Sequence, residues 1–231
     1  MALATTLRPI PSAELPNPLL FVAELSHRVA NEYAFMIASI SAAAAHSSNA
    51  ETKAALTGVS QLFFDYAEVH RALQPPLGEG PVDLCAYLQR VCGAMVRASL
   101  TRRGVKLLLL EDAIELDPAR CWRVGLIVSE LINNALRHAF SQDGGAIILE
   151  VRSRDGVVQC RVTDDGRPNT IAAPGQGSRI VDALAAELDG KIERNFGQWG
   201  AAVLLSFPLD PGRGARSALS RDKSAAARPV L

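Results

Sequence analysis

The chain has 231 residues, in which 24 lysines and arginines balance 24 aspartates and glutamates. This length allows one or two domains with a sizeable core, and a hydrophobic fraction of 48% excludes wholesale disorder. Zero formal net charge argues against bulk binding to nucleic acid, which needs a basic surface. No apolar run approaches the roughly 18 residues of a membrane-spanning helix, and residues 1–18 lack the apolar segment of a signal peptide. We therefore expect a cytoplasmic protein without membrane insertion.

Four cysteines stand at positions 85, 92, 121 and 160, and none belongs to a Cys-x-x-Cys pair. This spacing gives no reason to expect a zinc site. We expect all four to be small buried apolar residues in a reducing compartment.

Residues 15–75 follow a loose leader (1–14) and are predicted to form a helical hairpin. Apolar residues recur at steps of three and four, which indicates two amphipathic helices; they are Val22, Leu25, Val29, Tyr33, Met36 and Ile40, then Leu56, Val59, Phe63, Tyr66, Val69 and Leu73. The first helix should end near His46 and the second before Pro75. Because two helices bury little, we expect a second copy to complete a four-helix bundle in a homodimer.

Residues 81–208 change pattern and are predicted to form an α+β domain. Helices are expected over 83–103, from Pro118 onward and over 178–188; strands are expected over 105–110, 146–153, 157–163, 191–195 and 201–207. An Asp155-Gly156 turn joins two of the strands, and a Gly/Pro-rich loop covers 165–177. Strand hairpins interleaved with helices favour an α+β layer over a doubly wound parallel sheet. The remaining segment, 209–231, reads as a disordered basic tail.

His27 lies opposite the apolar stripe of its helix, beside Glu24 and Asn31, when each residue turns by about 100°. We therefore predict that its side chain is exposed. An exposed imidazole is most simply a solvated surface group. It is also what a phosphoacceptor needs, because the imidazole is largely neutral near pH 7. The pattern alone leaves both interpretations open.

Polar residues in two further segments suit a nucleotide. Glu130 and Asn134 share one face of a predicted helix, and a carboxamide oxygen is a hard ligand that suits Mg²⁺. Asp164 ends a predicted strand just before Gly166, where a carboxylate could accept a hydrogen bond from an adenine amino group. Each segment also has a purely structural interpretation, as a polar helix surface and as an ordinary Asp-Gly turn.

A Gly-x-Gly sequence at Gly175 and Gly177 precedes the next predicted helix. Such a start offers free N–H groups and the positive end of the helix dipole to a phosphate. A lone Gly-x-Gly is weak evidence by itself.

Taken in order, these segments resemble the sensor histidine kinases of the HWE type over about residues 19–208. The stretch ELSHRVAN is similar to that group's H box, which would make His27 the phosphorylated histidine. SELINNALRHAF is similar to the N box, which implies Asn134 as the Mg²⁺ ligand and Glu130, Arg137 and His138 beside the nucleotide. His27 and Glu130 are then the candidate catalytic residues.

Two glycine boxes complete the resemblance. VTDDGRP is similar to the first, with Asp164 as the adenine contact followed by Gly166; GQGSRIVDALAAELDGKIE is similar to the second, with Gly175, Gly177 and Ser178. The resemblance implies a GHKL (Bergerat) ATP-binding fold behind a dimerising hairpin, with ATP and Mg²⁺ as cofactors.

Three features depart from the family pattern. Pro168 stands where many histidine kinases have a second glycine, and only eight residues separate Gly166 from Gly175, which implies a very short lid over ATP. Arg28 follows His27 in place of an acid, as in the HWE-type pattern. The general base for His27 is therefore unassigned, and Glu24 on the same face is a candidate.

The resemblance implies an ATP-dependent protein histidine kinase of a two-component system, a phosphoprotein that passes its phosphate to a response-regulator receiver domain. Its input would come from a separate sensor protein. One alternative is a non-enzymatic histidine phosphotransfer protein with a degenerate ATPase-like domain, which Pro168 and the short lid motivate. Another is a protein-serine kinase or other gyrase-like ATPase, against which the hairpin bearing His27 counts.

Overall fold

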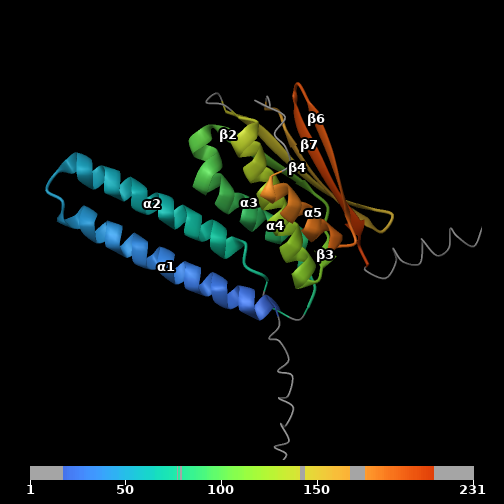
Figure 1. The fold of residues 1–231 in the computed structure, drawn as a ribbon, viewed down its shortest axis with the longest axis horizontal. Coiled ribbons are helices and arrows are strands. Elements are labelled where there is room, and N and C mark those ends of the chain that lie inside the picture. Colours follow the sequence, from blue (N-terminus) through green and yellow to red (C-terminus); the bar gives the residue numbers. More distant parts are fainter. Residues whose placement is uncertain (1–17, 77, 79, 141–143, 167–174, 211–231) are drawn as a thin grey trace, which may run out of the picture.

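The computed structural model describes residues 18–76, 78, 80–140, 144–166 and 175–210 (Figure 1). The expected leader, the tail beyond Asp210 and the position of Pro168 lie outside these residues. A helical hairpin leads into a unit in which helices pack on one sheet (Figure 1). No described helix is both long and apolar enough to span a bilayer.

The hairpin consists of α1 (Pro18–His46) and α2 (Ala50–Ala72), which run antiparallel as predicted (Figure 1). Asn49 caps the second helix, because its side-chain oxygen accepts a hydrogen bond from the Thr52 N–H at 2.9 Å. The polar residues between the two apolar stripes thus form the predicted turn.

The hairpin buries few of its apolar side chains. Ala44 is the one fully buried hydrophobic residue of α1 whose burial the structure describes, and α2 has none. Leu25 on the predicted stripe remains half exposed, and Phe35 is 75% exposed. Each helix of the hairpin can cover only one side of the other, so the remaining apolar side chains have no partner surface within the described part of this chain. For this reason the stripe predicts more burial than one chain provides.

The second unit contains these elements: β1 (Val82–Asp83), α3 (Leu84–Met95), a π-helical turn (Val96–Leu100), a 3₁₀ turn (Thr101–Arg103), β2 (Val105–Glu111), β3 (Glu115–Leu116), α4 (Pro118–His138), β4 (Gly145–Arg154), β5 (Val157–Asp164), α5 (Gln176–Ala186), β6 (Lys191–Gly197) and β7 (Gly200–Pro208). The helix expected over 83–103 is therefore α-helical only to Met95. The chain then unwinds through two short turns, and Gly104 ends them in the left-handed region with φ 65°.

The five-stranded sheet has the order β2-β4-β5-β7-β6. Only β2 and β4 pair in parallel, and the other neighbours are antiparallel, which confirms the α+β class. Asp155 and Gly156 both have positive φ in the tight turn between β4 and β5, as the sequence indicates. A separate two-stranded sheet joins β1 to β3 and was not predicted.

Helices α3, α4 and α5 lie on one face of the sheet, and the core fills the space between them (Figure 1). The largest fully buried side chains include Leu88, Ile127, Leu149 and Phe207. All four cysteines are buried, as predicted, and burial raises the pKa of each thiol to about 12. They are therefore protonated, unreactive core residues.

Helices α3 and α4 cross closely because of one glycine. A Cβ added at Gly125 would lie 2.5 Å from the Tyr87 ring, whereas one added at Gly93 on α3 would meet its nearest neighbour at 3.6 Å. The Tyr87 residue is only 1% exposed, and its ring fits against α4 because residue 125 has no side chain.

We expect Gly125→Ala to lower the free energy of unfolding by about 1–3 kcal/mol, the usual cost of an overpacked core. Gly93→Ala is the matched control and should be neutral or stabilising by up to about 1 kcal/mol, because alanine favours a helix over glycine. Urea unfolding of both variants measures the difference. Equal effects would contradict the close approach of Tyr87.

Candidate phosphoacceptor and nucleotide sites

His27 lies on the exposed side of α1, as predicted. Its Nδ1 atom is 3.4 Å from Nδ2 of Asn31, one helical turn later. The Asn31 amide can pair with either tautomer of the His27 ring: its NH₂ group donates to an unprotonated Nδ1, and its oxygen, if the amide is flipped, accepts from a protonated Nδ1. Glu24, the candidate base, instead contacts Arg28, whose Nε donates to the Glu24 carboxylate at 3.0 Å.

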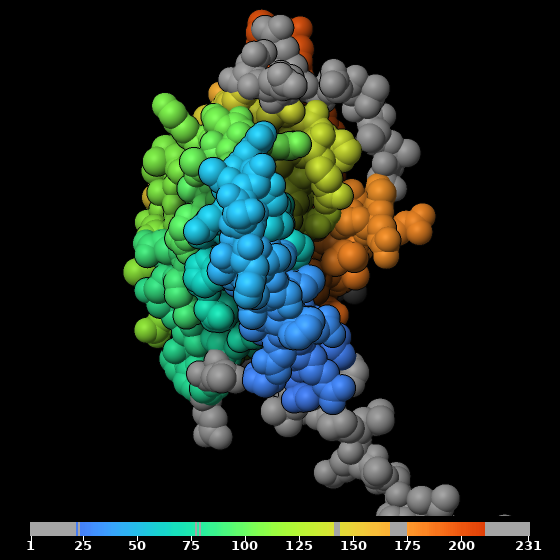
Figure 2. All heavy atoms as spheres, turned by 90° about the vertical axis from the view of Figure 1, so that its left-hand side faces the viewer, coloured from blue at the N-terminus to red at the C-terminus, as the bar shows by residue number. Residues whose placement is uncertain are grey.

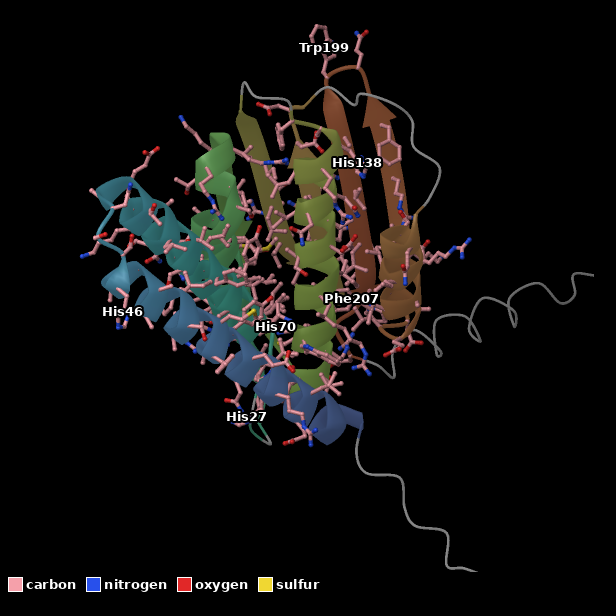
Figure 3. All side chains as sticks on the ribbon, turned by 60° about the vertical axis from the view of Figure 1, so that its left-hand side comes forward. His27, His46, His70, His138, Trp199 and Phe207 are labelled. Atoms are coloured by element: carbon pink, nitrogen blue, oxygen red, sulfur yellow. The ribbon has the colours of Figure 1, made fainter. Side chains whose placement is uncertain are left out.

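The C-terminal half of α4 carries a polar network. Arg137 donates from Nη2 to Glu130 Oε1 at 3.0 Å and to Asn134 Oδ1 at 3.2 Å. The Asn134 oxygen, the predicted cation ligand, is thus in contact with a guanidinium in this structure. His138 ends the helix with an exposed side chain (Figure 3).

The first turn of α5 lies directly against this network. A Cβ added at Gly177 would lie 1.9 Å from Glu130 Oε1, so the Glu130 carboxylate occupies the space beside this glycine and would have to move if residue 177 had a side chain. Gly175 is the N-cap and supplies no side-chain cap. The N–H groups of this first turn, which includes Ser178, therefore face the same region as Glu130 and remain suited to an anion.

Asp164 ends β5 as a buried carboxylate, 8% exposed. Its Oδ1 atom accepts hydrogen bonds from the N–H groups of Gly166 at 3.1 Å and Ala201 at 3.3 Å. Burial raises the pKa of Asp164, while these two hydrogen bonds lower it and the nearby Asp165 raises it further. The net effect is a carboxyl with a pKa above its ordinary value.

Two close backbone approaches and one side-chain hydrogen bond hold the Asp164 turn in place. A Cβ at Gly166 would lie 2.3 Å from the carbonyl oxygen of Ala139, at the end of α4. A Cβ at Gly200 would lie 1.9 Å from the carbonyl oxygen of Asp164, and Gly200 has φ 129°. Asp165 accepts a hydrogen bond from the Ala146 N–H at 2.7 Å.

Sequence reasoning missed the supporting residues Asp165, Gly200 and Ala201. The glycine at 200 is a turn signal in the sequence, but nothing local indicates that it faces the backbone carbonyl of a residue 36 positions earlier. Only the pairing of β5 with β7 brings them together.

The structure therefore joins most of the predicted nucleotide residues at one site. Glu130, Asn134, Arg137 and His138 come from α4, Asp164 and Gly166 from the end of β5, and Gly175, Gly177 and Ser178 from the start of α5. His27 is not among them, because it lies at the other end of the molecule from His138 (Figure 3).

These residues fit ATP with Mg²⁺. The buried Asp164 is an acceptor for an amino group, the uncapped start of α5 suits phosphates, and the Asn134 oxygen suits a hard cation.

Comparison with known proteins shows which proteins the chain is similar to. Residues 95–194 match the family described as "Histidine kinase-like ATPase domain". The chain is 30% identical over 199 residues to blue-light-activated histidine kinase 2 of Erythrobacter litoralis, covering 81% of this chain and 57% of the relative. It is 28% identical over 197 residues to the sensor histidine kinase PdtaS of Mycobacterium tuberculosis, covering 81% of this chain and 39% of the relative. The chain thus spans about half the length of the curated relatives it matches.

Solved structures share the fold. The histidine kinase domain of a blue-light-activated kinase of Erythrobacter litoralis has a TM-score of 0.56 at 24% identity, covering 78% of this chain and 96% of that one. A bacterial phosphotransferase has a TM-score of 0.58 at 13% identity, covering 85% and 100%. Residues 95–194 thus match a histidine kinase-like ATPase domain, and the chain is similar in sequence to the sensor histidine kinases, which confirms the resemblance seen in its motifs.

The two glycines that begin α5 should differ in their effect on ATP binding. Gly177→Ala would force the Glu130 carboxylate away from Arg137, and we expect ATP affinity to fall about three- to tenfold, the worth of roughly one hydrogen bond. Gly175→Ala meets open space and should change affinity less than about twofold. Calorimetric titration with Mg²⁺–ATP tests both, and equal affinities would refute the assignment of this helix start.

The raised pKa of Asp164 predicts a pH dependence of ATP binding. An adenine amino group needs the ionised carboxylate as acceptor, and a raised pKa means that protonation begins at a higher pH than for an ordinary aspartate. We expect wild-type affinity to weaken, relative to Asp164→Asn, as the pH falls from neutral toward the raised pKa of this carboxyl. The variant corrects for titration of the nucleotide itself. Parallel pH profiles of the two proteins would contradict the assignment of Asp164.

Proposed function

We propose that this chain is an ATP-dependent protein histidine kinase that phosphorylates His27 and passes the phosphate to an aspartate of a response-regulator receiver domain. One observation carries the proposal. The chain combines an exposed histidine on a helical hairpin with an ATPase-like domain that gathers a buried acceptor, a cation ligand and an uncapped helix start at one site.

Each part of the site has a separate task in binding. Asp164 would accept a hydrogen bond from the adenine amino group, and the first turn of α5 with Ser178 would bind the phosphates. Asn134 would hold the Mg²⁺ ion, in which case Arg137 leaves the Asn134 oxygen and is free to contact phosphate charge. Bound Mg²⁺–ATP supplies the phosphoryl group. The protein contributes positioning and charge stabilisation rather than covalent chemistry.

His27 supplies the acceptor nitrogen. Asn31, turned so that its oxygen accepts from the Nδ1–H, would leave the Nε2 lone pair facing outward. Because His27 is exposed on the surface of α1, a separate receiver domain can reach it as well. In that second step the P–N bond breaks, and a carboxylate oxygen of the regulator takes the phosphoryl group.

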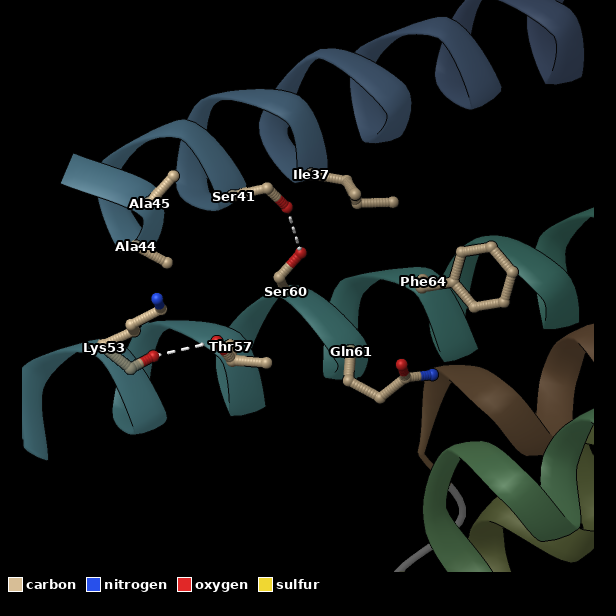
Figure 4. Close-up of a pocket in the computed structure, with 9 residues that line it drawn as sticks. All are labelled: Ile37, Ser41, Ala44, Ala45, Lys53, Thr57, Ser60, Gln61 and Phe64. Carbon is tan, nitrogen blue, oxygen red and sulfur yellow. Dashed lines mark hydrogen bonds between the residues drawn. The ribbon is translucent and has the colours of Figure 1, made fainter. Parts of the chain in front are cut away.

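The hairpin surface supports a homodimer. The hairpin forms a ridge along one face of the molecule (Figure 2) and exposes the large apolar side chains of Phe35 and Phe64. Between α1 and α2 lies an open groove whose walls are mostly small side chains (Figure 4); its lining residues are Ile37, Ser41, Ala44, Ala45, Lys53, Thr57, Ser60, Gln61 and Phe64. Small residues let another helix approach closely, so two further helices from a second copy would complete a four-helix bundle.

A histidine phosphotransfer protein without kinase activity is the second candidate. Two observations favour it. Arg137 already engages the oxygens of Glu130 and Asn134, and His27 lies apart from the ATPase-like site. In this case His27 would take phosphate only from another phosphorylated protein.

Incubation with Mg²⁺ and γ-labelled ATP tests the two candidates. We expect acid-labile label on the wild-type chain, none on His27→Ala, and a loss of at least about tenfold for Asn134→Ala, in the range that single catalytic contacts contribute. His46→Ala is the matched control, because His46 is an exposed histidine on the same helix, and it should be labelled normally.

Absence of label on the wild type, together with transfer to His27 from a phosphorylated receiver domain, would refute the kinase and support the phosphotransfer protein. Label that survives in His27→Ala would refute the site in both. Acid-stable label would point to a serine kinase.

A further inference from the structure

One side-chain hydrogen bond joins the end of the hairpin to helix α4 of the ATPase domain. Trp122, in the second turn of α4, donates from Nε1 to the carbonyl oxygen of Leu73 at 2.9 Å. Leu73 is the C-cap of α2. Carbonyl groups at a helix C-terminus lack an intrahelical partner, so the indole satisfies an acceptor that would otherwise need water.

Apolar contacts surround this hydrogen bond. Val69, Ala72 and Leu73 pack against the core of the ATPase domain, and Pro75 beyond them is buried. Helix α2 also contacts α3 and the π-helical turn, whereas the turn between α1 and α2 lies away from the domain (Figure 1). The hydrogen bond of Trp122 is the part of this interface that joins the hairpin to α4.

The orientation of the hairpin keeps His27 away from the nucleotide site of the same chain. Asn134 stands 12 residues after Trp122 on α4, or about 18 Å along the helix. On the hairpin, the Tyr33 ring lies 5.9 Å from the His70 ring, near the end of α2. His27 precedes Tyr33 by six residues, or about 9 Å toward the open end of the hairpin.

His27 thus lies near the beginning of α4, and the polar network lies near its end (Figure 3). Phosphoryl transfer needs the reacting atoms within roughly 3–3.5 Å of each other. The arrangement in this structure does not permit that approach within one chain. It does leave His27 exposed to another protein.

We infer that Trp122 is a positioning residue that latches the hairpin in an arrangement suited to phosphotransfer from His27 but not to its phosphorylation by the same chain. This inference rests on the proposed kinase function. Opening the contact between Trp122 and Leu73 would then be a step of autophosphorylation within one chain and not of transfer to the receiver domain.

Trp122→Phe tests the latch, because it keeps an aromatic ring and removes the N–H donor. Loss of one buried hydrogen bond should multiply the open population about two- to tenfold. We expect hydrogen exchange at the amides of Leu73 and Gln74 to accelerate, and the initial rate of autophosphorylation to rise, by factors in this range. Transfer from phosphorylated His27 to a receiver domain should keep its wild-type rate.

Trp199→Phe is the matched control, because it makes the same change at an indole that is 71% exposed on the turn between β6 and β7. It should leave the exchange at Leu73 and Gln74 unchanged. Val69→Ala is a second variant that weakens the apolar part of the contact and keeps the indole. It should accelerate exchange and autophosphorylation as Trp122→Phe does.

Hydrogen exchange tests the latch, and labelling by ATP tests the kinase function, so the two can fail separately. Unchanged exchange in both Trp122→Phe and Val69→Ala would overturn the latch, whatever the labelling shows. Faster exchange with an unchanged or lower autophosphorylation rate would overturn the positioning role. Faster exchange with no label on any variant, wild type included, would instead refute the proposed kinase function.

Discussion

Helix α4 borders the candidate nucleotide site, and its packing against neighbouring groups depends on three glycines. Gly125 admits the Tyr87 ring on one side of the helix, and the Glu130 carboxylate fills the space beside Gly177 at the start of α5. Gly166 brings the Asp164 turn against Ala139, the C-cap of the helix. Because interiors are close-packed, a methyl group added at any of the three would displace the neighbouring group.

The site is organised before any ligand enters it. Asp164 is buried yet held by two backbone N–H groups, so its oxygen is fixed while its charge is only partly compensated. The start of α5 presents N–H groups without a side-chain cap. Burial of an incompletely compensated carboxyl and an uncapped helix end both cost stability. Such costs at one place in a fold are typical of a binding site.

The hairpin differs from the ATPase domain in what stabilises it. The domain has a continuous core, whereas the hairpin leaves Phe35 and much of its apolar stripe in solvent. Its attachment combines the packing of α2 on α3 and the π-helical turn with the hydrogen bond from Trp122 to Leu73. The proposed kinase requires a second arrangement of these two units, in which this interface opens.

The sequence by itself determined the helices, nearly all the strands and the α+β class, because periodicity, Gly and Pro are local signals. It also determined that His27 is exposed, since a period of 3.6 residues places that side chain opposite the stripe. It predicted one continuous helix over 83–103 and missed the π-helical turn, because no local signal marks a change of helical pitch. Only the tertiary structure decided that Gly200 and Ala201 support Asp164, that Arg137 engages the Asn134 oxygen, and that Trp122 contacts Leu73. The contact between Arg137 and Asn134 lies within one helix, but no sequence pattern specifies the rotamer of Arg137. The other contacts join residues far apart in the chain. Such pairs leave no periodic trace in a sequence and form only when strands pair and helices pack.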